Sequence, residues 1–245
     1  MSTASFVIQH SSAASQWAKS EASGFFRFIV HPSYRGLGAG DSQWALRALY
    51  LSLMVIVLLL PVAYAISSLQ ELFGIEERSL GNIDIPKLLL IVVLVPLIEE
   101  VLFRAGLKNP FWSLAVAPLV TMMILINSGQ GLILFMLLMF AMLSITFVYQ
   151  KSFFGNSQMQ LKRLHSRKFQ MVFWANCTYF SWAHLSNFDL SGSQIWLCWL
   201  VVFPQLVMGA LLGYLRLRDG IKSSILSHAT INLIGVSGFV MEKLT

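Results

Sequence analysis

Long apolar runs constrain this chain more than any other feature of its sequence. Seven runs approach the roughly 20 residues that an α-helix needs to cross a bilayer: 45–68, 86–107, 111–127, 130–150, 169–187, 194–215 and 222–241. Inside a bilayer the backbone N–H and C=O groups must bond within the protein, and helices satisfy them locally. The sequence therefore predicts an all-α, polytopic transmembrane helical bundle of about seven spans. The third run is short, so a tilted or re-entrant segment stays open for it.

The composition agrees with a membrane protein. Hydrophobic residues make up 56% of the 245 residues and charged residues 11%, whereas soluble domains carry roughly 25% charged residues. The formal net charge of +6 is attributed to cytosolic loops and not to nucleic-acid binding, because such loops are rich in Lys and Arg. Cys177 and Cys198 lie inside apolar runs, which indicates packing residues and not a disulfide framework.

The distribution of basic residues predicts the orientation. If the N-terminus is cytosolic, only Arg78, Lys87 and Lys243 of the 17 basic residues fall on the opposite side, and Arg104 falls within a span. Lys and Arg collect on the cytosolic side of membrane proteins, so we expect a cytosolic N-terminus. The basic loop 151–168 should then face the cytosol, where it suits anionic lipid headgroups.

Two regions follow from this division. Residues 1–44 form a cytosolic or interfacial N-terminal segment, and residues 45–241 form the transmembrane domain. Phe25, Phe26 and Phe28 flank Arg27 in the first region. They favour either a helix lying on the inner leaflet or a simple connector to the first span.

Ionisable groups within membrane spans are costly and are usually paired or functional. The candidates are the ionisable residues Glu99, Glu100, Arg104, His184 and His228, with the amide residues Asn127, Asn176, Gln205 and Asn232 as polar neighbours.

The two adjacent glutamates differ in whether a basic partner lies on their face of the helix. Glu100 and Arg104 are four residues apart, so they share a helix face and can pair. Glu99 is rotated by about 100° from Glu100 and lacks such a partner. Apolar surroundings favour the protonated form of an unpaired carboxylate, a condition that suits a general base near neutral pH. The alternative is that both glutamates only neutralise Arg104.

The later polar residues also have two interpretations each. His184 follows Phe180 by four residues and is either catalytic or a hydrogen-bonded packing residue. His228 and Asn232 are also four residues apart, on one face. They can stabilise a developing negative charge, or they can join helices by hydrogen bonds.

Three motifs on separate apolar runs together resemble the motif pattern of a known protein family. They are Glu-Glu-x-x-x-Arg at 99–104, Phe-x-x-x-His at 180–184 and His-x-x-x-Asn at 228–232. In this order they resemble the CAAX-protease and bacteriocin-processing family (CPBP or Abi), which includes the type II CAAX prenyl endopeptidases. The resemblance runs from about residue 86 to residue 240 and implies an intramembrane glutamate protease.

The resemblance also implies roles for six residues. Glu99 and His184 would hold and activate the attacking water. Glu100 and Arg104 would brace the site, and His228 and Asn232 would stabilise the oxyanion. No cofactor is expected. Zinc stays an alternative, although the chain has no H-E-x-x-H motif and asparagine is a poor zinc ligand.

Two features depart from the family pattern. Arg104 and His184 are widely separated, which indicates an inserted helical hairpin and basic loop near 111–168. In addition, at about 1.5 Å per residue, Glu99 and His228 fall in the cytosolic half of the bilayer, whereas His184 falls too far toward the opposite side. Either its helix protrudes into the cytosol before it enters the bilayer, or it tilts strongly.

The predicted function is thus an intramembrane endopeptidase that hydrolyses a peptide bond of a membrane-associated or lipidated peptide or protein. Its expected partners are that substrate and a bilayer with anionic lipids, and its expected location is the cytoplasmic membrane of a bacterium. A non-catalytic immunity or assembly factor is the main alternative. A proton-coupled transporter ranks lower, since its polar residues should follow a path through both leaflets.

The orientation can be tested by cysteine labelling in a variant without Cys177 and Cys198. An impermeant thiol reagent applied to intact cells should label a single cysteine placed in 71–84 and not one placed in 151–168. Labelling of the second loop from outside would overturn the predicted topology.

Overall fold

The computed structural model describes residues 3–33, 41–78, 81, 84–108, 112, 116–127, 168–190 and 192–244. These residues are almost entirely helical, with one short antiparallel strand pair. The expected helical bundle is therefore confirmed. The predicted span 130–150 and the basic loop up to residue 167 lie outside the described residues.

The described helices differ widely in length. Their bounds are α1 (Thr3–Val30), α2 (Trp44–Phe73), α3 (Ile85–Leu89), α4 (Val95–Glu99), α5 (Ala117–Asn127), α8 (Phe169–Ala183), α9 (Cys198–Val201), α10 (Phe203–Arg218) and α11 (Ile221–Leu244). Tighter or wider turns join several of them, namely the π-helical turns η1 (Leu90–Leu94) and η2 (Glu100–Arg104) and the 3-10 turns η3 (Ala105–Lys108), η5 (His184–Asn187) and η6 (Gly192–Leu197).

Two described helical segments, Trp44–Phe73 and Ser193–Arg218, are long and apolar enough to cross a bilayer. The first of them leaves large apolar side chains such as Val57, Leu60 and Tyr64 exposed, and an uncovered apolar face of this length suits lipid. The helix Ala117–Asn127 is apolar but shorter, as expected for the third run. The total of seven spans and the cytosolic N-terminus stay predictions.

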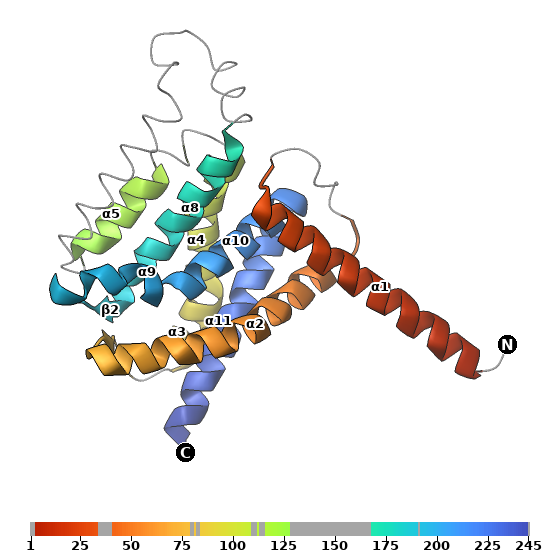
Figure 1. Cartoon of the computed structure of the whole chain (residues 1–245), viewed down its shortest axis with the longest axis horizontal. Coiled ribbons are helices and arrows are strands. Elements are labelled where there is room, and N and C mark those ends of the chain that lie inside the picture. Colours follow the sequence, from red (N-terminus) through yellow and green to blue (C-terminus); the bar gives the residue numbers. More distant parts are fainter. Residues whose placement is uncertain are drawn as a thin grey trace, which may run out of the picture.

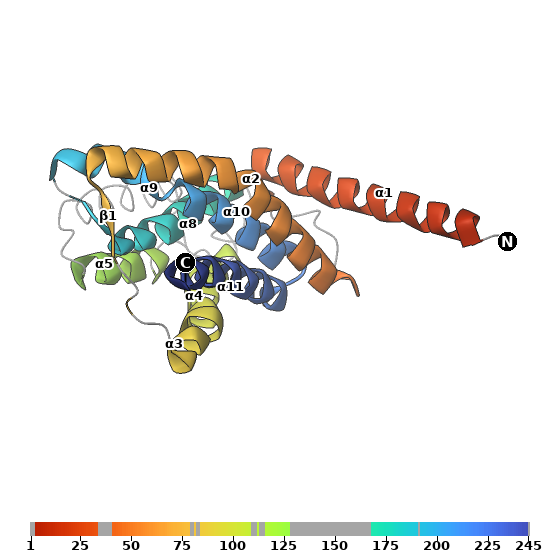
Figure 2. The same cartoon turned by 90° about the horizontal axis from the view of Figure 1, so that it is seen from below.

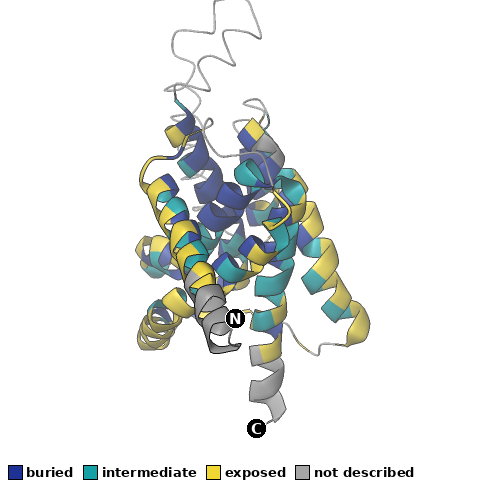
Figure 3. Cartoon of the chain, turned by 90° about the vertical axis from the view of Figure 1, so that its right-hand side faces the viewer, coloured by how far each residue is buried: buried dark blue, intermediate teal, exposed yellow. Residues whose placement is uncertain are grey.

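Helix α10 lies at the centre of the bundle. It packs against α8, α11 and α2, and α11 passes between α2 and the η1–α4 segment (Figures 1 and 2). Helix α5 packs against α8, where the Thr121 hydroxyl donates to the carbonyl of Tyr179 at 3.1 Å. Figure 3 shows that the buried residues gather in the middle of the bundle.

Helix α1 extends away from the bundle toward the N-terminus (Figure 1), and its C-terminal half docks, with Trp17 packed against Tyr50 of α2. Phe25 and Phe28 are buried there, with ring centroids 5.5 and 5.2 Å from that of Tyr214. Phe26 is 48% exposed. Two of the three phenylalanines considered for the membrane surface therefore belong to the protein core, which corrects that part of the expectation.

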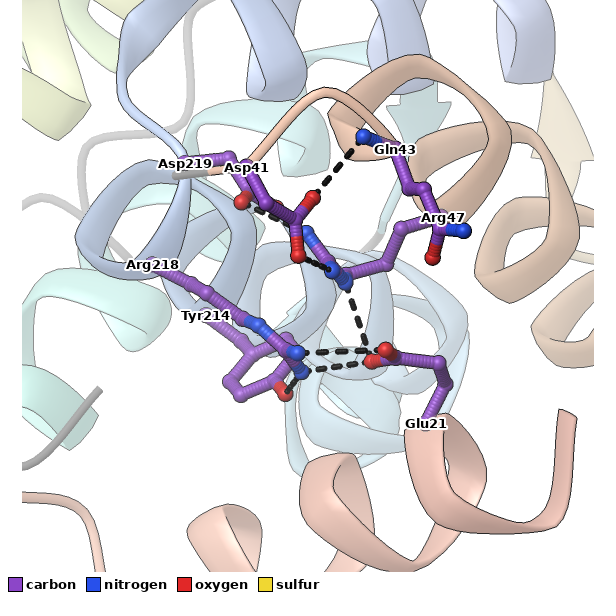
Figure 4. A network of polar contacts seen from close by, with 7 residues as sticks. All are labelled: Glu21, Asp41, Gln43, Arg47, Tyr214, Arg218 and Asp219. Carbon is purple, nitrogen blue, oxygen red and sulfur yellow. Dashed lines mark hydrogen bonds and ion pairs between the residues drawn. The ribbon is translucent and has the colours of Figure 1, made fainter. Parts of the chain in front are cut away.

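A buried polar cluster fastens this end of α1 (Figure 4). The guanidinium of Arg47, 1% exposed, donates to Glu21 at 2.9 Å, to Asp219 at 2.6 Å and to Asp41 at 2.7 Å. Arg218 also binds Glu21. The hydrogen bond from Arg47 lowers the pKa of Asp41, whereas burial raises the pKa of Asp219. Arg47 is one of the basic residues that the predicted orientation assigns to the cytosolic side, and in the structure it crosslinks α1, α2 and the α10–α11 turn.

The turn between α10 and α11 fixes where α11 begins. Gly220 adopts φ 94°, a conformation that residues with a Cβ atom rarely adopt. About two turns further along α11, the hydroxyls of Ser227 and Ser52 share a hydrogen bond of 2.6 Å. Helix α11 is therefore tied to α2 immediately before His228.

At the other end of α2, strand β1 (Glu76–Glu77) pairs antiparallel with strand β2 (Phe188–Asp189). Arg78 and Asp189 form an exposed ion pair at 2.7 Å, and such pairs stabilise a fold only slightly. The pairing connects the segment after α2 to the segment after α8.

Close helix packing at Gly213 gives a stability prediction. A Cβ atom at Gly213 would lie 2.7 Å from the Phe173 ring, whereas one at Gly235 would meet nothing within 4 Å. Gly213→Ala should therefore lower the stability by about 1–3 kcal/mol through overpacking. Gly235→Ala should be neutral or slightly stabilising, since alanine favours helix. Thermal unfolding in detergent compares the two, and equal melting temperatures would contradict this packing.

Candidate active site

A buried ion pair lies at the base of the site. Glu100 and Arg104 are both fully buried, with Glu100 Oε2 3.7 Å from Arg104 Nε. Arg104 also donates to Asn176 Oδ1 at 3.3 Å, and its guanidinium carbon lies 4.3 Å from the centre of the Phe180 ring. The pairing expected from the spacing of four residues is present. Its further contacts bind the helix of Arg104 to α8.

The imidazole of His228 lies between the two glutamates. Its Nδ1 is 3.1 Å from Glu100 Oε1, and its Nε2 is 3.5 Å from Glu99 Oε2. Glu99 is the more accessible carboxylate, with 25% of its side chain exposed against 0% for Glu100. The first motif residue of α11 thus joins the carboxylates of Glu99 in α4 and Glu100 in η2.

These contacts determine where His228 carries its hydrogen. A carboxylate of Glu100 paired with Arg104 can only accept, so His228 donates from Nδ1. The neutral ring then presents the lone pair of Nε2 toward Glu99. A favourable contact there requires one proton, either on His228 Nε2 or on the carboxyl of Glu99. The geometry therefore makes Glu99 and His228 a pair that can share a proton.

Acidic and basic groups alternate along this row of side chains. In the order Glu99, His228, Glu100 and Arg104, the net charge is zero when all four are ionised. It is also zero when Glu99 and His228 are both neutral. Buried charges are tolerated when they are paired in this way. The proton between Glu99 and His228 can thus move without leaving net charge in the protein interior.

His184 reaches the same site from α8. Its Nδ1 lies 2.9 Å from the carbonyl of Phe180, which can only accept, so Nδ1 carries the hydrogen and Nε2 of the neutral ring is an acceptor. The Phe180 ring lies 4.7 Å from the ring of His184 and 5.8 Å from that of His228. The Phe180 ring therefore contacts both histidines, and the guanidinium of Arg104 lies over the same ring.

A mostly apolar pocket of about 280 Å³ opens beside these rings. Helix α2 contributes aliphatic residues such as Ile56 and Leu60, and α10 contributes Gln205. His184, His228 and Asn232 form its polar part. The structure thus brings His184 next to His228, and the estimate of depth that separated them was wrong. That estimate assumed a helix that runs straight along the bilayer normal from Lys168.

Asn232 has a structural partner. Its Nδ2 donates to the carbonyl of Ile91 at 3.0 Å. Ile91 lies in the π-helical turn η1, where the N–H of Val95 donates to the carbonyl of Leu90, five residues earlier. In the same pattern the carbonyl of Ile91 would accept from residue 96, but this residue is Pro96 and has no N–H. Asn232 satisfies the carbonyl that Pro96 leaves free. Among the contacts of the described residues the other N–H of the amide has no partner, so both interpretations of Asn232 fit one side chain.

All six predicted site residues thus converge on one region. Glu99 and His184 make no direct contact among the contacts of the described residues, and the water expected between them requires none. Asn176 was considered only as a polar neighbour, yet it holds Arg104 and also donates to the carbonyl of Phe103 at 2.8 Å. Its spacing was the available signal: Asn176, Phe180 and His184 follow one another at four-residue intervals on one face of α8.

Within the part of the chain that the structure describes, no three His, Cys, Asp or Glu side chains are grouped to hold a metal ion.

The fold and the site define a membrane protein with a buried row of carboxylates and imidazoles beside an apolar pocket. The sequence model of the Rce1-like type II CAAX prenyl endopeptidases matches residues 81–234, a range that contains all three motifs. The chain belongs to this family of proteases, which confirms the resemblance drawn from the motifs. No significant match was found among curated proteins or among solved structures.

The buried pair yields a second stability prediction. Glu100→Gln should lower the stability by about 3–5 kcal/mol, because it leaves the buried charge of Arg104 uncompensated. The double variant Glu100→Gln with Arg104→Gln should lose less than the single one. Glu76→Gln, at an exposed glutamate, is the control. Thermal unfolding in detergent measures all three, and a single variant as stable as the control would show that the pair is not required.

Proposed function

We propose that the protein is an intramembrane endopeptidase that hydrolyses a peptide bond with a water molecule held between Glu99 and His184. The observation that carries the proposal is the placement of His228 between the two glutamates, at a pocket that His184 and Asn232 also line. The family is consistent with this reaction class.

In the first step the water oxygen attacks the carbonyl carbon of the scissile bond. Glu99 accepts one proton of the water, while Nε2 of His184 accepts a hydrogen bond from it. The electron pair of the carbonyl moves onto its oxygen. In the second step this pair reforms the carbonyl, the C–N bond breaks, and the proton on Glu99 passes to the leaving amine nitrogen. Glu99 then returns to its starting state.

The negative charge on the carbonyl oxygen needs donors in a region of low dielectric constant. The second N–H of Asn232 is one, and Nε2 of a protonated His228 is the other. His228 becomes a donor when it carries the proton that it shares with Glu99. Glu100 and Arg104 keep the ring in position throughout, and they touch no reacting atom.

The pocket and the family support a proposal for the substrate class. Aliphatic residues of α2 line one side of the pocket, which suits an apolar side chain or a lipid chain. The family name designates prenylated proteins with a CAAX ending. We therefore propose a lipidated or membrane-associated peptide as substrate, cleaved near the cytosolic side of a bilayer with anionic lipids, without a metal ion. The cytoplasmic membrane of a bacterium is the proposed location.

Glu99→Gln tests the proposal directly. The probe is a quenched fluorescent peptide with a farnesylated cysteine in a C-terminal Cys-aliphatic-aliphatic-X sequence, supplied in liposomes. The substitution removes the proton acceptor, so the rate of cleavage should fall at least about 10²-fold. The melting temperature of the variant should equal that of the control variant. The control is Glu71→Gln, at an exposed glutamate near the end of α2.

Two results would contradict the mechanism. Near-normal turnover by Glu99→Gln would remove Glu99 from the reaction. Loss of activity on prolonged treatment with a strong chelator, restored by zinc, would replace the metal-free mechanism by a metal-assisted one.

A further inference from the structure

Gln205 carries an unused acceptor in the candidate active site. It lies in the first turn of α10 and lines the pocket together with His184, His228 and Asn232. Its Oε1 is buried and, among the described residues, has no hydrogen-bond partner. None of the three motifs of the family resemblance includes this residue.

A buried carbonyl oxygen without a donor is unfavourable by about 1–3 kcal/mol, and most such groups in folded proteins are satisfied. The neighbours in the pocket do not supply the donor. The residues of α2 in the pocket wall are aliphatic, and the adjoining Pro204 has no N–H. Nδ1 of His184 is bonded to the Phe180 carbonyl, and one N–H of Asn232 to the Ile91 carbonyl. Gln205 Oε1 therefore has no donor among the described residues, and a rotation of this side chain at the pocket wall would let a ligand supply one from its own N–H or O–H group.

A peptide substrate brings such groups. Its backbone N–H groups must leave water when the scissile bond enters the pocket, and each unpaired one would oppose binding. A prenyl or acyl chain has no donor. The acceptor on α10 therefore complements the peptide part of a lipidated substrate, while the aliphatic wall on α2 complements its apolar part.

We propose that Gln205 binds the substrate, with its Oε1 accepting a hydrogen bond from one backbone N–H near the scissile bond. The interaction orients the peptide across the site, so that the scissile carbonyl faces the donors on α11. This inference rests on the proposed function, because it assumes that a peptide occupies the pocket.

Ester substitution in the probe tests the inference. A series of farnesylated reporter peptides each replaces one backbone N–H, away from the scissile bond, by an ester oxygen. With the wild-type protein, one ester position should weaken kcat/KM by about 10-fold, the effect of losing one hydrogen bond of about 1.4 kcal/mol. In Gln205→Leu the parent peptide should show that loss already, and the same ester should cause no further loss. Gln170→Leu, at an exposed glutamine of α8, should retain the wild-type pattern.

Competition binding of the same peptides to Glu99→Gln protein separates this inference from the proposed function. If the ester dependence on Gln205 appears in binding while the wild-type protein cleaves nothing, the proposed function fails and the role of Gln205 stands. If the peptides are cleaved and no ester position depends on Gln205, the role of Gln205 is wrong and the proposed function stands. If no peptide binds, both are wrong.

Discussion

The buried pair of Glu100 and Arg104 is the interaction on which the rest of the site depends. An arginine without exposure to solvent needs a counter-charge within reach, and Glu100 supplies it from one helical turn away. The other oxygen of Glu100 accepts a hydrogen bond from Nδ1 of His228. One carboxylate therefore neutralises Arg104 and also determines which ring nitrogen of His228 carries the hydrogen. The opposite nitrogen of His228 then meets Glu99. Of the two carboxylates, Glu99 is thereby the one that does not pair with Arg104 and that keeps some exposure.

The fold brings His228 to this position by holding α11 at several points. Arg47 binds Asp219 in the turn before the helix (Figure 4), and Ser52 bonds to Ser227. Further along, Asn232 bonds to the carbonyl of Ile91. These polar contacts join α11 to neighbours on both of its sides, where apolar packing alone would allow the helix to slide or rotate. In a bundle surrounded by lipid such hydrogen bonds between helices are a principal source of specific packing.

The sequence predicted the local parts of this arrangement well. The helical class follows from the apolar runs, and the pairing of Glu100 with Arg104 follows from their spacing on one helix. The position of His228 could not be predicted in the same way, because 128 residues separate it from Glu100 and only the packing of α11 brings them together. The contact of Asn232 depends on a π-helical turn next to Pro96 that the apolar pattern does not reveal. The role of Arg47 could not be predicted from the apolar pattern, because two of the three carboxylates that enclose it, Glu21 and Asp219, come from distant segments.

The central claim is that Glu99 and its histidine neighbours cleave peptide bonds in the membrane. The most direct measurement compares the protein termini in membranes of cells that express either the intact protein or Glu99→Ala at equal levels. The account predicts a defined set of new termini, at sites near the cytosolic face, that appears with the intact protein and is missing with the variant. Identical termini in both membranes, in cells where both proteins are folded and abundant, would contradict it and would favour a binding role for this site.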